Sequence, residues 1–118
     1  TPNFGALNLD SLSQEGCTRL RKIDASIGLL RKLTVLNMKD CKSVIRLPPF
    51  GEALNIEDMN LEGCIHLRQI DPSIGILRKL TFLNLKDCKN LVSLLSSIFG
   101  LNSLEYLNLS GCSNCIIS

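Results

Sequence analysis

The side chains best suited to chemistry in this sequence are six cysteines and a single histidine. Cys112 and Cys115 are separated by two residues, and His66 follows Cys64 by two, so each pair could supply half of a zinc site. Zinc needs four protein ligands, or three and a water, and no second pair with a suitable spacing accompanies either half. The sequence therefore predicts that the chain binds no metal.

Five of the cysteines recur in one column of a repeat. They are Cys17, Cys41, Cys64, Cys88 and Cys112, separated by steps of 24, 23, 24 and 24 residues. Parallel strands stack about 4.8 Å apart, so neighbours in the column approach disulfide range. Their Cβ atoms would point the same way, which would strain a bridge. We therefore expect a structural ladder of buried, reduced thiols and a reducing compartment.

Catalysis has little support, because any Ser/His/Asp or Cys/His arrangement would have to be built on His66 alone. The sequence has no G-x-x-x-x-G-K-[ST] phosphate loop. A net charge of +2 gives no strong case for nucleic acid or anionic membrane, and the apolar runs are too short to span a bilayer. We predict a chain that is not an enzyme, has no cofactor, and has neither nucleic acid nor membrane as a partner.

The elements that position the cysteines belong to the pattern Leu-x-x-Leu-x-Leu-x-x-Cys. Copies start near residues 33, 56, 80 and 104, and a worn copy starts near 9. A period of 23–24 residues with this spacing is typical of a leucine-rich-repeat solenoid. The prediction is one α/β domain over 1–118, a horseshoe fragment of about five coils. Its concave face carries a parallel β-sheet, and its convex face is irregular or short-helical because Pro48, Pro49 and Pro72 disfavour a long helix.

A longer period also runs through the chain. Residues 6–47 align without a gap to 53–94 and are identical at 25 of 42 positions. Duplication of a two-coil block explains this, because each coil of a solenoid contacts only its neighbours. The absence of an initiator Met and of a signal segment led us to expect a piece of a longer protein.

Positions that alternate with the inward Leu columns face outward on the concave side. The predicted protein-binding residues are Val35, Asn37, Lys39, Asp58, Asn60, Glu62, Phe82, Asn84, Lys86, Tyr106 and Asn108. Phe82 and Tyr106 would be adjacent, and exposed aromatics bordered by polar groups are typical binding anchors. They could instead merely fill a strand surface that tolerates aromatics. The Asn amides are expected to bond to one another along the sheet, and the alternating Glu and Lys residues are expected to form lateral ion pairs.

Two positions break the pattern. Gln14 occupies a Leu column of the first coil, where an unpaired buried amide would cost about 1–3 kcal/mol. The first coil is therefore expected to be frayed, or Gln14 faces an end that another segment covers. Cys115 and Ser118 fall where Leu and Ile are expected. Neither end looks like a polar cap, so we predict marginal stability for this stretch alone.

Two segments carry a family resemblance. Leu80-Thr81-Phe82-Leu83-Asn84-Leu85-Lys86-Asp87-Cys88 and Leu104-Glu105-Tyr106-Leu107-Asn108-Leu109-Ser110-Gly111-Cys112 resemble repeats of plant intracellular nucleotide-binding leucine-rich-repeat immune receptors. The branch with a Toll/interleukin-receptor-like domain is the most similar, since its Leu-x-x-Cys strand precedes a Leu-Pro-x-x-Ile turn. Here Leu95 replaces that Pro, and Pro72 in Ile70–Ile74 comes one residue later.

The resemblance implies a disease-resistance module of innate immunity and signal transduction. Such repeats bind protein partners, namely a pathogen effector or a guarded host protein, and contact other domains of the same receptor to keep it inactive. The implied location is the cytoplasm, with the nucleus as a further site. Nucleotide exchange and any NAD-cleaving chemistry would belong to other domains.

Three other assignments stay open. The ectodomain of a cell-surface receptor usually carries Asn where this chain has Cys, followed by a Gly-x-Ile-Pro turn. A free-standing cytosolic scaffold also tends to keep Asn in that column. An enzyme that uses such repeats to bind its substrate would need a catalytic domain outside this chain.

Overall fold

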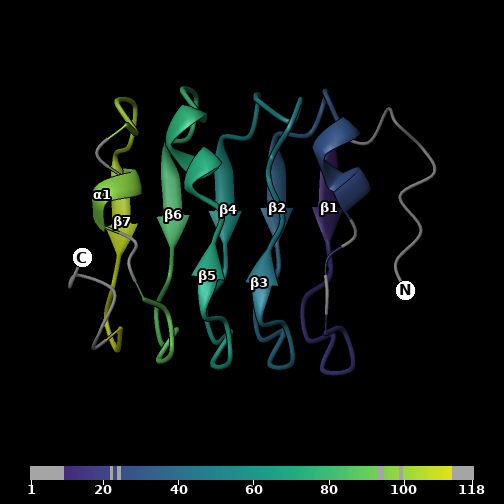
Figure 1. Cartoon of the computed structure of the whole chain (residues 1–118), viewed down its shortest axis with the longest axis vertical. Coiled ribbons are helices and arrows are strands. Elements are labelled where there is room, and N and C mark those ends of the chain that lie inside the picture. The colour runs from purple at the N-terminus through teal and green to yellow at the C-terminus, as the bar shows by residue number, and fades with distance from the viewer. Residues whose placement is uncertain (1–9, 22, 24, 93–94, 99, 113–118) are drawn as a thin grey trace.

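Five short strands form one parallel sheet in the computed structural model of the chain, which describes residues 10–21, 23, 25–92, 95–98 and 100–112. The strands are β1 (Ser11–Ser13), β2 (Val35–Asn37), β4 (Asp58–Asn60), β6 (Phe82–Asn84) and β7 (Tyr106–Asn108). They lie side by side in chain order (Figure 1). The predicted five-stranded parallel sheet is therefore confirmed.

The register keeps equivalent residues of each repeat in contact. Leu36 of β2 pairs with Leu12 of β1 on one side and with Met59 of β4 on the other. Leu83 of β6 continues this row between Met59 and Leu107. A slip of one residue would turn the whole row toward solvent, so the alternating sequence pattern specifies this register.

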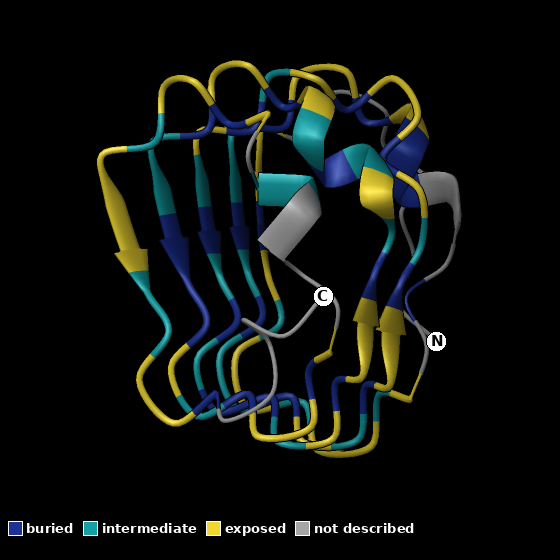
Figure 2. Cartoon of the chain, turned by 60° about the vertical axis from the view of Figure 1, so that its left-hand side comes forward, coloured by how far each residue is buried: buried dark blue, intermediate teal, exposed yellow. Residues whose placement is uncertain are grey.

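The opposite side of the molecule is made of less regular elements (Figure 2). Strands β3 (Arg46–Leu47) and β5 (Gln69–Ile70) form a two-stranded parallel sheet. The helical pieces are the 3-10 helices η1 (Ala25–Leu29) and η2 (Pro72–Ile76) and the α-helix α1 (Leu95–Ile98). Pro72 suits the first position of η2, where the Asp71 side chain accepts from Ser73 N at 2.9 Å. Helical structure is thus scarce.

The apolar core lies between the two sides. Leu33, Leu36, Ile56 and Leu80 are at most 1% exposed, and Phe50, also 1% exposed, belongs to the same core cluster. Burying one such side chain stabilises the fold by about 1.5–3 kcal/mol. Leu107 of β7 is still 37% exposed, since no described strand packs beyond β7.

A left-handed residue precedes the cysteine in every repeat. Gly16, Asp40, Gly63, Asp87 and Gly111 have φ values of 74°, 60°, 78°, 63° and 80°. Glycine adopts this conformation without strain, and Asp tolerates it better than most residues. The positive φ turns the chain out of the strand, so the next residue, the cysteine, points into the core.

Candidate functional site

The cysteine column joins successive repeats through side chain to backbone bonds. Each Sγ–H donates to the carbonyl three residues before the cysteine of the preceding repeat: Cys41 to Gln14 at 2.9 Å, Cys64 to Met38 at 3.0 Å, Cys88 to Leu61 at 3.1 Å and Cys112 to Leu85 at 2.8 Å. In the first described repeat, Cys17 donates instead to Oε1 of Gln14 at 3.1 Å. Each of these carbonyls also accepts the backbone N–H of the cysteine in its own turn, so the thiol adds a second hydrogen bond that links the turn to the next repeat.

Burial also makes these thiols poor nucleophiles. Desolvation raises the pKa of Cys41, and it raises the pKa of Cys64 to about 12. A thiol attacks as the thiolate, so neither is suited to covalent chemistry near neutral pH. In the described ranges, no group of three or more His, Cys, Asp or Glu side chains could hold a metal ion. Cys115 and Ser118 lie outside the described residues.

One row across the sheet carries the predicted aromatic anchors. Val35, Asp58, Phe82 and Tyr106 are consecutive partners in the strand register. The rings of Phe82 and Tyr106 are stacked, with centroids 4.5 Å apart and planes inclined by 6°. Tyr106 is 42% exposed, and the other three are half-buried. The sequence prediction that the two aromatics are adjacent therefore holds.

The asparagine row behaves differently from the prediction. Oδ1 of Asn37, Asn60, Asn84 and Asn108 accepts from the backbone N–H two residues later, at 2.9–3.1 Å. Nδ2 of Asn84 donates to Glu62 at 2.9 Å, and Nδ2 of Asn37 donates to Glu15 at 3.3 Å. The expected amide-to-amide bonds are replaced by these, because the local backbone N–H is the nearer donor.

Asn84 requires a correction, because it was expected to face solvent and is only 6% exposed. It lies between Asn60 and Asn108 in the register, and both ends of its amide are bonded. A buried amide with satisfied partners stabilises its turn and is a poor contact for another protein. Asn37, Asn60 and Asn108 are half-buried.

The charged column lies at the ends of the strands. Lys39 Nζ is 3.9 Å from Glu62 Oε2, a lateral pair of the expected kind. Since both partners are partly exposed, this pair contributes only about 0–1 kcal/mol. Lys86, the member of this column two residues after Asn84, is exposed to solvent.

Asp58 is the charged member of the aromatic row. Burial raises the pKa of its carboxyl group. Its register neighbours are Val35 and Phe82, which offer no compensating charge. The carboxylate is therefore poorly solvated and available to a cation on a partner.

Gln14 is neither unpaired nor fully buried, and β1 just before it pairs with β2, so the expected fraying of the first coil is not seen at this strand. The Gln14 side chain is half-buried, and its Oε1 accepts from Cys17 Sγ. Its backbone N–H donates to Asn37 O at 2.8 Å, so the first repeat is joined to the second at this point.

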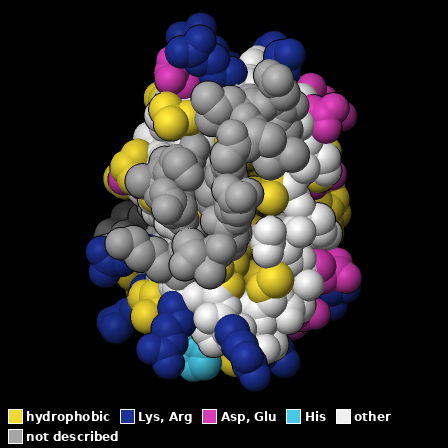
Figure 3. Space-filling model, turned by 90° about the vertical axis from the view of Figure 1, so that its right-hand side faces the viewer, with side chains coloured by type: hydrophobic (Ala, Val, Ile, Leu, Met, Phe, Trp, Pro, Cys, Tyr) yellow, Lys and Arg dark blue, Asp and Glu magenta, His cyan; other side chains and the backbone are white. Residues whose placement is uncertain are grey.

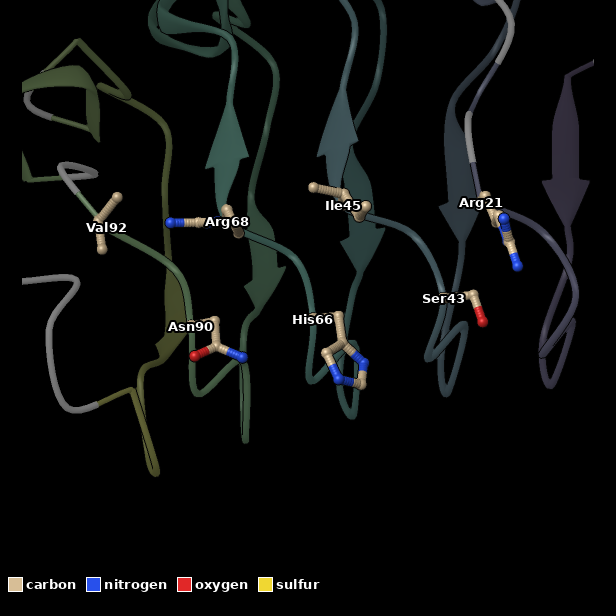
Figure 4. Close-up of a pocket in the computed structure, with 7 residues that line it drawn as sticks. All are labelled: Arg21, Ser43, Ile45, His66, Arg68, Asn90 and Val92. Atoms are coloured by element: carbon tan, nitrogen blue, oxygen red, sulfur yellow. The ribbon is translucent and has the colours of Figure 1, made fainter.

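A groove on the opposite side was not predicted from the sequence. It lies beside β3 and β5, and Arg21, Ile45, Arg68 and Val92 line it together with three polar residues (Figure 4). The signal that could have revealed it is the charge pattern, since residues 17–23, 41–50, 64–70 and 88–92 contain several basic residues and no acidic ones.

Among the described residues, the helices are too short and too polar for a membrane crossing.

The chain was also compared with known proteins, and no family model matches it. It is 49% identical over 43 residues to the disease resistance protein RPP2A of Arabidopsis thaliana, a match that covers 36% of this chain and 3% of the plant protein. A leucine-rich-repeat protein of Leptospira interrogans aligns with 77% of this chain and 29% of its own, at 20% identity and a TM-score of 0.49. The chain thus spans a small part of both proteins.

The repeat spacing, the parallel sheet and the similarity to the plant protein agree with one another. Together they support a protein-interaction module of leucine-rich-repeat type.

Proposed function

We propose that this chain is the leucine-rich-repeat solenoid segment of a plant disease-resistance receptor of the Toll/interleukin-receptor-like branch. In this proposal the concave repeat surface contributes to recognition of a pathogen effector or a guarded host protein, and to autoinhibition. The similarity to the disease resistance protein over 43 residues supports the plant immune role. The observation that carries the binding role is the stacked Phe82–Tyr106 pair on the outer face of the sheet.

The aromatic pair suits a binding anchor because it is rigid and only partly covered. Stacking restricts both rings before a partner arrives, so little side-chain entropy is lost on binding. Tyr106 adds a hydroxyl that already accepts from Asn108 Nδ2 at 3.1 Å. Asp58 beside Phe82 offers a carboxylate to a Lys or Arg side chain of the partner.

Autoinhibition follows if another domain of the receptor occupies the same surface. A ligand that binds the surface more tightly would then displace that domain and shift the receptor toward its active state. Recognition of the ligand and release of the inhibitory domain would use the same residues, so substitutions there would affect both processes.

The cytoplasm, and also the nucleus, is the proposed location. Buried thiols that donate to backbone carbonyls are useful only while they stay reduced, and those compartments keep thiols reduced.

The test uses the full-length gene that contains this stretch. A nucleotide-binding domain encoded upstream in frame is the expected result, and a signal peptide directly upstream would contradict the proposal. In leaf cells, the full receptor with Phe82→Ser and Tyr106→Ser should accumulate normally and lose its ligand-triggered response. Ile76→Ser is the matched control, because Ile76 is 50% exposed on η2, away from the sheet. An unchanged response of the double variant would remove the aromatic pair from the binding surface.

A further inference from the structure

A groove with a volume of about 720 Å³ lies on the side of the molecule opposite the aromatic pair. One of its rows comes from four successive repeats, each residue standing four positions after the cysteine of its repeat (Figure 4). The row reads Arg21, Ile45, Arg68, Val92, so charged and apolar side chains alternate. Ile45 is 44% and Val92 38% exposed, so apolar surface lies between Arg21 and Arg68 and again beyond Arg68.

A second row of the groove is held in place by bonds to the backbone. Ser43 Oγ donates to Thr18 O, and Asn90 Nδ2 donates to Ile65 O at 2.8 Å. Nδ1 of His66 lies 2.7 Å from Lys42 O. Since a carbonyl can only accept, Nδ1 carries the proton, and Nε2 is left for another partner. This row is therefore ordered before any ligand binds, which lowers the entropic cost of binding.

The two charged residues that line the groove, Arg21 and Arg68, are both basic. Six exposed basic residues stand in the acid-free segments: Arg19, Arg21, Lys42, Arg46, Arg68 and Lys89. Figure 3 shows Lys and Arg side chains gathered at the lower end of one face. Asp40 and Asp87, which precede two of these segments, hold their carboxylates against Gly63 and Gly111 of the next repeat, and Asp71, which follows a third, accepts from Ser73 N.

Arg31 forms an ion pair with Glu52 at 2.6 Å. In the described part of the chain, neither Arg21 nor Arg68 has such an ion pair. With a net charge of only +2 on the whole chain, this concentration of cations is a local feature of the groove. It provides a complementary surface for an anionic ligand.

The spacing and the apolar members point to a peptide. Arg21 and Arg68 are two repeats apart, or about 9.6 Å at the usual strand spacing. A peptide in the polyproline II conformation places every third side chain on one face, at intervals of about 9.3 Å. Nucleic acid would leave Ile45 and Val92 without a role, and none of the described residues that line the groove is the Phe, Tyr or Trp that usually stacks on bases.

We propose that this groove binds an extended acidic peptide segment with Asp or Glu at every third position and apolar residues between them. The carboxylates pair with Arg21 and Arg68, and the apolar side chains contact Ile45 and Val92. The site lies on the other side of the molecule from the aromatic pair, so it does not depend on the immune role of that surface.

The test measures fluorescence anisotropy of the whole chain with a labelled peptide that repeats Glu-Leu-Pro four times. Binding should weaken with added salt, and the peptide with Gln in place of Glu should bind at least about tenfold more weakly, as expected for loss of charge-assisted pairs. Arg21→Gln with Arg68→Gln should produce a similar loss. Arg78→Gln, an exposed arginine outside the groove, should change the affinity less than twofold.

A charge-reversed pair keeps the test independent of folding. Arg21→Glu with Arg68→Glu should lose the Glu peptide and gain the peptide with Lys in place of Glu, which an unfolded variant could not do selectively. Equal binding of the Glu and Gln peptides, or an equal loss with Arg78→Gln, would overturn the proposal. Tighter binding of a DNA duplex or of phosphatidylserine vesicles than of the Glu peptide would overturn the assignment to a peptide.

Discussion

The carboxylate of Asp40 lies against the Cα of Gly63 in the next repeat. A Cβ built on Gly63 would clash with Oδ1 of Asp40 and would stand 3.2 Å from its Cγ. Asp87 and Gly111 repeat the relationship, with Oδ1 of Asp87 2.5 Å from the Cβ position. Asp and Gly alternate in this left-handed column, so the side chain of one repeat occupies the space that the next leaves empty.

Gly63→Ala should therefore destabilise the chain more than Gly16→Ala. Both positions have positive φ, which costs an L-residue about 1–2 kcal/mol. Only Gly63 adds a steric conflict, because nothing lies within 4 Å of a Cβ on Gly16. Urea unfolding of the two variants measures the difference. Adding Asp40→Gly to Gly63→Ala should remove most of this difference in stability. If the double variant is no more stable than Gly63→Ala alone, the Asp40 carboxylate is not the group that clashes with the new Cβ.

Asp87→Gly should stabilise the chain by up to about 1 kcal/mol, because it relieves the left-handed conformation of a residue that carries a Cβ. Asp87→Ala is the matched control, since it removes the carboxylate and keeps the Cβ. It should be no more stable than the wild type. If Asp87→Gly lowers the free energy of unfolding, the carboxylate makes a favourable contact that outweighs its strain.

Gln14→Leu should change the melting temperature little, although its column is apolar elsewhere. Gln14 is half-buried at the end of the described sheet and bonded to Cys17, so Leu gains little buried area. Met38→Gln, in the same column one repeat later, should cost about 1–3 kcal/mol because Met38 is 1% exposed and the new amide would be buried without a partner. Thermal unfolding followed by circular dichroism distinguishes them. A large gain from Gln14→Leu would place position 14 in the core.

Cys17 should react with iodoacetamide at pH 8 much faster than Cys64, whose pKa of about 12 and burial suppress the thiolate. Mass spectrometry of partly alkylated protein gives the two rates, and in denaturant they should become equal. The raised pKa of Cys64 also makes the stability of the fold depend on pH. An unfolded thiol ionises near pH 8.5 while folded Cys64 stays protonated, so stability falls as pH rises above about 8.5 toward 12. Equal native rates would contradict the buried position of Cys64.

Asp58→Asn should raise the melting temperature at pH 7, because burial raises the pKa of Asp58 and the folded state disfavours its charge. The free energy of unfolding falls as pH rises from the pKa of Asp58 in the unfolded chain, about 3.9, to its higher pKa in the folded chain. The advantage of the variant should therefore vanish below about pH 3.5. Melting curves of both proteins at pH 3 and 7 test this. A variant less stable than the wild type at pH 7 would show that the carboxylate has a stabilising partner.

The sequence by itself determined the repeat, the columns and the parallel sheet. The alternation of inward Leu36 and Met38 with outward Asn37 is a local property of an extended chain, and a period of 23–24 residues repeats it in register. The same regularity placed Phe82 beside Tyr106 and put the cysteines in one column, which is buried at all members except the half-buried Cys17. These inferences require only that equivalent residues stack.

The tertiary structure alone decided which atoms bond across repeats. Asn84 bonds to Glu62 and to its own turn, Gln14 receives the thiol of Cys17, and Asp40 lies over Gly63. The bond between Asn84 and Glu62 and the contact of Asp40 with Gly63 join residues more than 20 positions apart. Their geometry depends on how adjacent repeats are placed, which the column positions do not specify. The groove beside β3 and β5 has the same origin, since it forms where side chains of four repeats fail to meet.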